Sequence, residues 1–163
     1  MQFTRRTMLV GLAALTAACS KFKRYDGPLV TRIAVTKSDL KMNLFHNEDV
    51  LKTYDISLGF APIGPKQVEG DGKTPEGHYY IDRRNPNSAF HLSLGISYPN
   101  EEDIAYAASM GLEPGGDIFI HGQKGWIDPG DGNWTAGCIA VTNKEIEEIY
   151  SMVGTGVPID ISA

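Results

Sequence analysis

The chain has 163 residues, 42% of them hydrophobic, and carries 15 Lys or Arg against 20 Asp or Glu, a formal net charge of −5. This length suits one domain with a substantial hydrophobic core. Removal of Arg5 and Arg6 with a leader would leave 13 basic against 20 acidic residues, so the mature chain has no basic surface of the kind that binds nucleic acid.

Residues 1–18 have the pattern of an export signal. A basic start precedes an apolar run from Met8 to Leu15, which is too short to cross a bilayer, and small residues precede Cys19. The sequence around Cys19 resembles a bacterial lipobox, with Thr16 where a larger aliphatic residue is usual. It predicts that Cys19 becomes the lipidated first residue of the mature protein. The alternative is an ordinary secretory signal cleaved near Ala18.

Both alternatives place the protein on the periplasmic side of a bacterial envelope, either anchored in the membrane through the lipid or soluble. Residues 19–27 are short and mostly polar and predict a tether, which leaves residues 28–163 as the folded domain. The expected partners therefore include the membrane, through the lipid anchor, and exclude nucleic acid.

The body of the domain is predicted to be mainly β, as a mixed β-sandwich with two or three short helices. Alternating or β-branched runs predict strands at 29–36, 41–45, 50–58, 78–81, 89–94, 118–121, 139–141 and 157–161. Capping residues predict helices over Ile104–Met110 and Ile146–Val153. Residues 59–77 are rich in Gly and Pro and predict a long loop.

His121 and Cys138 are the candidate catalytic residues. His121 ends one apolar run, Cys138 begins another, and a loop rich in Gly, Asp and Pro separates them. An imidazole within hydrogen-bond reach converts a Cys thiol to a thiolate and later protonates a leaving amine. Gly137 allows a sharp turn, so the amides of Gly137 and Cys138 are predicted to face a developing oxyanion. The alternative is that Cys138 is a small buried hydrophobic residue.

The cysteine count favours the catalytic interpretation. The chain has two Cys, and if Cys19 carries lipid then Cys138 is a free thiol in an oxidising compartment. The sequence has no His-x-His or Cys-x-x-Cys spacing, so no metal site and no cofactor is predicted.

The motifs resemble those of the YkuD-type L,D-transpeptidase catalytic domain. They are His121-Gly122, then Thr135-Ala-Gly-Cys138-Ile, with Gly64-Pro-Lys66, the segment from Glu69 to Gly77 and Ser97-Tyr-Pro-Asn100 upstream. Many members have a second His directly before the Gly-Cys, where this chain has Ala136. The variant found here is similar to a subgroup that contains murein hydrolases as well as transpeptidases.

The resemblance implies the L,D-transpeptidase fold and a set of substrate-binding residues around the catalytic pair. They are Lys66, Asp71, Thr74, Gly122, Trp134 and Thr135. Trp134, four residues before Cys138, is expected to form a wall for the peptide stem, whereas Trp126 is either a core residue or a second wall.

Three functions are compatible with these features. The first is an L,D-transpeptidase in which Cys138 forms a thioester with a peptidoglycan stem peptide and an amine acceptor resolves it. The second uses the same site with water, as a murein hydrolase or amidase that cleaves stem peptides or links to peptidoglycan-attached lipoprotein. The third is a non-enzymatic lipoprotein that binds peptidoglycan, against which the presence of both a thiol and its base argues.

Overall fold

The computed structural model describes residues 20–124 and 132–163. The export signal, Cys19 and Trp126 lie outside these residues. The described chain forms eight strands and two helices, which confirms the mainly β prediction. The strands are β1 (Arg32–Thr36), β2 (Lys41–His46), β3 (Asp49–Asp55), β4 (Gly77–Asn85), β5 (Ser93–Ile96), β6 (Phe119–His121), β7 (Ile139–Ala140) and β8 (Pro158–Ser162), and the helices are α1 (Glu101–Ser109) and α2 (Asn143–Met152).

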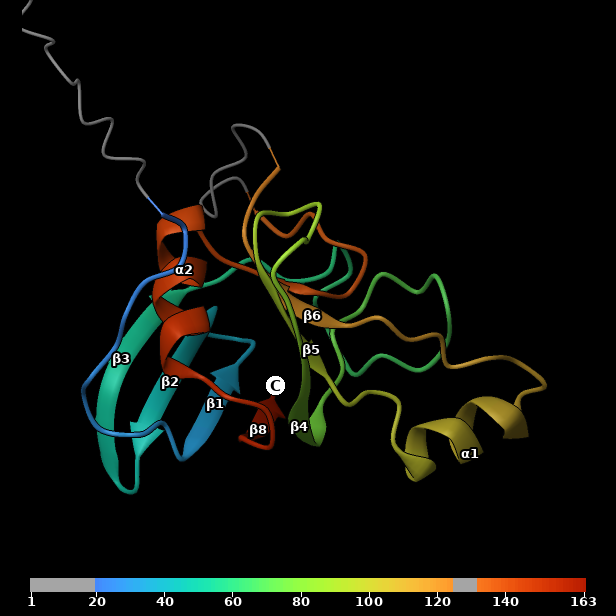
Figure 1. Ribbon diagram of the computed structural model, residues 1–163. Helices are drawn as coiled ribbons and strands as arrows, with labels where there is room; N and C mark the ends of the chain where they lie inside the picture. Colours follow the sequence, from blue (N-terminus) through green and yellow to red (C-terminus); the bar gives the residue numbers. More distant parts are fainter. Residues whose placement is uncertain (1–19, 125–131) are drawn as a thin grey trace, which may run out of the picture.

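The strands form a single sheet in the order β3-β2-β1-β8-β4-β5-β6-β7. Strand β4 belongs to both halves, because its first residues pair with β8 and its later residues with β5, with a register shift between Ile81 and Arg83. The sheet curls around one apolar core (Figure 1). Thus the two layers expected of a sandwich are the two halves of one curled sheet.

The two edges of the curled sheet meet next to β7. Ser57, just after β3, exchanges backbone hydrogen bonds of 2.9 and 2.8 Å with Ala140 in β7. Phe60 then donates to the carbonyl of Thr135 over 2.8 Å. Because β3 and β7 are the opposite edges of the sheet, these bonds nearly close it and hold the segment before β7 from a second side.

Both helices begin at the capping residues that the sequence indicates. Thr142 caps α2 in a capping box with Glu145, and Asn100 caps α1 in a capping box with Asp103. Each helix starts three residues before the predicted apolar run, because the apolar run marks the buried face and the cap marks the first turn. Helix α1 lies to one side of the sheet (Figure 1), where Asp103 accepts a hydrogen bond of 2.9 Å from the Tyr79 hydroxyl in β4. No helix within the described ranges is long and apolar enough to span a membrane.

Residues 20–28 run alongside the domain and contact it (Figure 1). The Lys21 ammonium donates to the carbonyl of Pro86 over 2.7 Å, and Lys23 forms an ion pair of 3.1 Å with Glu147 in α2. The segment predicted to be a tether therefore packs beside α2 and beside the turn after β4.

Candidate active site

His121 ends β6, and Cys138 immediately precedes β7, the parallel strand beside it. Ile120 pairs with Ile139 in β6 and β7, so Cys138, one residue before β7, lies beside Phe119. The side chains of His121 and Cys138 line the same cavity, which has a volume of about 240 Å³. The other residues that line it are Asn85, Ser88, Phe90, Ser93, Asp117 and Phe119. The pair that the sequence separates by a loop is thus brought together by strand pairing.

One hydrogen bond sets the proton arrangement of His121. Its Nδ1 lies 2.6 Å from the carbonyl oxygen of Gly122. Because a carbonyl only accepts, Nδ1 carries the proton, and the Nε2 lone pair of the neutral ring is left to accept another. Burial lowers the pKa of His121, although the bond to Gly122 acts in the opposite direction. His121 is therefore a neutral imidazole at pH 7, the form that a general base requires.

Two aromatic side chains hold the His121 ring. The Phe90 ring centroid lies 4.6 Å from that of His121, and Trp134 meets His121 edge-on at 5.7 Å. The Trp134 ring centroid also lies 6.0 Å from that of Phe90, and its role as a wall for the peptide stays a prediction. The packing fixes the orientation of the ring and keeps water from it.

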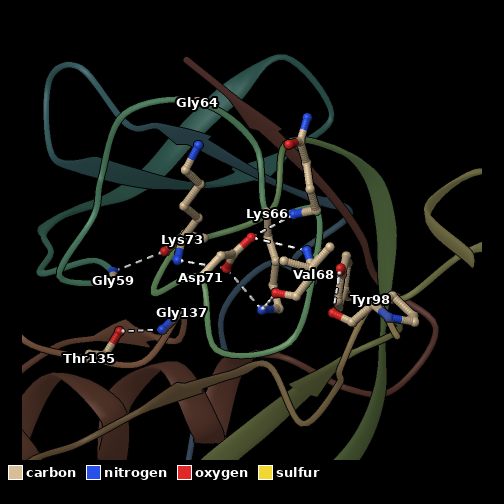
Figure 2. A network of polar contacts seen from close by, with 12 residues as sticks. Gly59, Gly64, Lys66, Val68, Asp71, Lys73, Tyr98, Thr135 and Gly137 are labelled. Atoms are coloured by element: carbon tan, nitrogen blue, oxygen red, sulfur yellow. Dashed lines mark hydrogen bonds and ion pairs between the residues drawn. The ribbon is translucent and has the colours of Figure 1, made fainter. Parts of the chain in front are cut away.

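Thr135 and Gly137 shape the turn that presents Cys138. The Thr135 hydroxyl donates to the carbonyl of Cys138 over 2.7 Å. It accepts from the amide of Gly137 over 3.1 Å (Figure 2). Gly137 has φ +129°, and a Cβ there would lie 2.6 Å from the carbonyl oxygen of Lys73. Only glycine fits this position, because it must combine a positive φ with contact against another backbone.

The same geometry bears on the predicted oxyanion hole. The Gly137 amide donates to Thr135, so in this state it does not point freely at the cavity. The oxyanion-binding role of Gly137 and Cys138 stays a prediction. It requires the Thr135 bond to open or to be shared when substrate is bound.

The Cys138 thiol is protonated in the resting site. Burial raises its pKa, a hydrogen bond from the backbone of Phe119 acts against this, and the charges of Asp117 and Lys66 raise and lower it respectively. The Sγ lies 3.5 Å from the carbonyl oxygen of Asp117, to which the thiol donates. Sequence reasoning expects a thiolate formed by His121. Desolvation raises the pKa of Cys138 and lowers that of His121, which favours the neutral form of each, and proton transfer between them stays a prediction.

Lys66 and Asp71 are engaged in the loop of residues 59–77. Asp71 accepts from the Lys66 ammonium at 3.1 Å and from the backbone amides of Gln67, Val68 and Lys73 at 2.7 to 3.1 Å (Figure 2). The side chain of Lys66 is only 4% exposed. These two residues stabilise the loop. Direct contact of either with substrate stays a prediction.

Thr74 and Gly122 are also buried. The Thr74 hydroxyl accepts from the amide of Gly59 over 3.0 Å, and a Cβ at Gly122 would lie 2.9 Å from a side-chain carbon of Ile146 in α2. Both positions hold the surroundings of the catalytic residues in place, as does Thr135. The substrate contacts that the resemblance implies for them stay predictions.

Several residues that line the cavity are absent from the sequence-based set. Phe119 precedes His121 by two positions in β6, and side chains of a strand alternate between its faces. Its position on the face of His121 could therefore have been read from the sequence. Asp117 lies before β6 with φ +55°, so alternation does not place it. Asn85, Ser93 and Phe90 reach the cavity through pairing with distant strands, for which the sequence carries no local signal. Among the residues described, no group of three His, Cys, Asp or Glu could hold a metal ion.

Residues 30–161 match the family model YkuD, the L,D-transpeptidase catalytic domain. A relative from Escherichia coli (strain K12), named "Putative L,D-transpeptidase YafK", is 34% identical over 117 residues, which make up 71% of this chain and 42% of the relative. The chain thus spans less than half the length of this curated relative.

Solved structures share the fold. The helical cell shape determining protein Pgp2 from Campylobacter jejuni is 26% identical, with a TM-score of 0.60, over 85% of this chain and 49% of that one. An L,D-transpeptidase from Mycobacterium smegmatis, at 16% identity and a TM-score of 0.55, covers 80% of this chain and 58% of its own, and shows the fold alone.

Proposed function

Since the chain belongs to the YkuD family of L,D-transpeptidase catalytic domains, we propose that it is a peptidoglycan L,D-transpeptidase with Cys138 as nucleophile and His121 as base. The observation that carries the proposal is the shared cavity of these two side chains, with Nδ1 of His121 committed to Gly122. This arrangement supports proton transfer from the thiol to Nε2, which a buried structural cysteine does not need.

The reaction follows from the neutral resting pair. The thiol proton moves to Nε2 of His121 as Sγ attacks the main-chain carbonyl of meso-diaminopimelate in the stem peptide. The imidazolium then protonates the leaving amine, and a thioester remains on Cys138. An acceptor amine attacks the thioester and loses a proton to His121, and the collapse of this second adduct restores the thiol.

Hydrolysis of the thioester is the second candidate. Ala136, where many relatives have His, is exposed beside the nucleophile turn. A methyl group at this place leaves more room for water near the thioester than an imidazole would. The donor would then be a stem peptide or a link to peptidoglycan-attached lipoprotein.

The test is a mass analysis of products from tetrapeptide muropeptides and, separately, from sacculi that carry attached lipoprotein. Diaminopimelate-to-diaminopimelate dimers, or exchange of the terminal residue for an added D-amino acid, support transfer. Released lipoprotein or shortened monomers, without either of these products, would show that the reaction is hydrolysis instead. Cys138→Ala and His121→Ala should each lower the rate at least about 100-fold, whereas His78→Ala, at an exposed His on β4, should not.

We also propose that the protein is a lipoprotein of the periplasmic side, held by a diacylglyceryl group on Cys19. The lipobox-like sequence supports this, and Cys19 itself lies outside the described residues. Fractionation of cells that express Cys19→Ala decides the matter. Release of the variant from the membrane is the expected result, and full retention would reject the lipid anchor.

A further inference from the structure

A row of residues crosses the cavity face of the sheet from β4 to β7. Arg83 pairs with Gly95, and Gly95 pairs with Phe119. Phe119 in turn lies beside Cys138 at the start of β7. Since paired residues project to the same face, Arg83 points toward the side of the sheet that bears the nucleophile.

Gly95 lets the Arg83 side chain cross the sheet. A Cβ at Gly95 would lie against Cγ of Arg83 and 2.9 Å from its Nε. With no side chain there, the guanidinium reaches over β5 and lies 4.5 Å from the ring centroid of Phe119. Arg83 is therefore a cation held above the residue that neighbours Cys138.

Asp117 brings an anion to the same place. It has φ +55°, a conformation that costs a non-glycine residue about 1 kcal/mol. Asp117 is among the residues that line the cavity, and its carboxylate is 91% exposed and accepts from Nη2 of Arg83 over 3.1 Å. The Arg83 side chain is 41% exposed. An exposed ion pair contributes only about 0 to 1 kcal/mol, so fold stability does not account for this strained arrangement.

The chemistry of the pair identifies a ligand. Diaminopimelate carries two amino acid ends, and the stem peptide uses one of them, whose carbonyl Cys138 attacks. The other end is free, with an ammonium and a carboxylate on one carbon. A guanidinium beside a carboxylate is its charge complement. The leaving terminal residue offers only a carboxylate, because its nitrogen belongs to the peptide bond that is cut.

We propose that Arg83 and Asp117 form a specificity subsite for the free amino acid end of diaminopimelate, with the carboxylate on Arg83 and the ammonium on Asp117. The inference rests on the proposed function for its choice of substrate. Arg83 has the planar donors that suit a carboxylate. Its Nη2 donates to Asp117 over 3.1 Å and its Nη1 to Asp82 over 2.8 Å, so the ligand carboxylate would take the place of Asp82 on Nη1. Asp82 is 36% exposed and can turn to solvent, so binding needs no rearrangement of the core.

Binding measurements test the subsite without turnover. In a Cys138→Ala background, the affinity for L-Ala-γ-D-Glu-meso-diaminopimelate-D-Ala is compared by calorimetry with that for the same peptide with lysine, which lacks the free-end carboxylate. We expect the diaminopimelate peptide to bind about tenfold more tightly. Arg83→Gln should bring the two affinities together. Arg32→Gln, which removes another guanidinium stacked on an aromatic ring at 4.0 Å, on β1, should preserve the preference.

Two further peptides test whether Arg83 binds the free-end carboxylate of diaminopimelate or the carboxylate of the terminal D-Ala. Amidation of the free-end carboxylate should weaken binding as much as lysine does, and acetylation of the free-end amine should weaken it in the parent but not in Asp117→Asn. Three results would overturn the subsite. They are equal affinities of the parent for the diaminopimelate and lysine peptides, no detectable binding of either peptide, and a preference for diaminopimelate that survives Arg83→Gln. The subsite would also be overturned if removal of the terminal D-Ala weakened binding while amidation of the free-end carboxylate did not. A protein that binds with this preference yet forms no thioester would refute the proposed function alone.

Discussion

Two pairs of opposite charges flank the nucleophile, and they differ in exposure. The Lys66–Asp71 pair has side chains that are 4% and 13% exposed, whereas those of the Arg83–Asp117 pair are 41% and 91% exposed. Each pair joins a basic nitrogen to a carboxylate oxygen over 3.1 Å. The buried pair is part of a loop network that includes three backbone amides. The exposed pair lies against Phe119 and the open cavity.

The difference shows that burial, and not residue type, separates a structural ion pair from a candidate binding pair. Buried charges must be paired and hydrogen-bonded within the protein, and their removal leaves uncompensated groups. Exposed charges keep their hydration and remain able to exchange water for a ligand. The resemblance-based set of substrate-binding residues includes the buried pair and omits the exposed one.

The largest expected contrast concerns stability. Asp71→Asn should lower the free energy of unfolding by about 3 kcal/mol, because the Lys66 ammonium loses its anion and three amides lose a charged acceptor. Asp117→Asn should change it by less than about 1 kcal/mol. Urea denaturation of both variants measures the difference. Equal losses of unfolding free energy in the two variants would contradict the distinction between a structural pair and an exposed pair.

A second contrast concerns Gly95. Gly95→Ala should lower the free energy of unfolding by about 1 to 3 kcal/mol, because the added Cβ meets the Arg83 side chain, and it should abolish the preference for diaminopimelate over lysine peptides. Gly154→Ala is the matched control, since its Cβ would stand in open space. It should stay within about 0.5 kcal/mol of the parent. A Gly95→Ala protein that is as stable as the parent and keeps the preference for diaminopimelate would contradict the inference that the Arg83 side chain crosses β5 over Gly95.

A third expectation concerns the pH dependence of the buried pair. Burial alone would raise the pKa of Asp71, but the amides of Gln67, Lys73 and Val68 together with Lys66 outweigh it, and the pKa is lowered. A carboxyl with a lower pKa in the folded state stabilises the protein above its unfolded pKa of about 3.9, and this contribution is lost as the pH falls through the folded value.

The stability gap between the parent and Asp71→Asn should therefore be largest near neutral pH and narrow below about pH 4. Thermal or urea unfolding across this range measures it. A gap that widened on acidification would show that the carboxyl is not held as an anion.

The smallest expected effects concern the thiol itself. Because burial raises the pKa of Cys138, iodoacetamide should modify it with a midpoint above the ordinary thiol value of about 8.5. Asp117→Asn should move the midpoint down and Lys66→Met should move it up, each by about half a pH unit or less. Shifts of the same sign would show that the two pairs do not act on Cys138 through their charges.

The sequence by itself determined the features that depend on neighbouring residues. The capping boxes at Asn100 and Thr142, most of the strands, and the glycine before Cys138 all follow from local spacing and backbone chemistry. The motifs around His121 and Cys138 also identified the family, since each motif is a short continuous segment. The position of Phe119 on the face of His121 could also have been inferred from the alternation of strand β6.

Only the tertiary structure decided which of these residues meet and how much water each one retains. The closure between Ser57 and Ala140 joins strands at opposite edges of the sheet, and the approach of Arg83 to Phe119 depends on a glycine in the strand between them. Burial pairs the Lys66 ammonium with Asp71, and desolvation raises the pKa of Cys138 and lowers that of His121. Solvation and long-range pairing are properties of the whole packed chain, so no local pattern in the sequence specifies them.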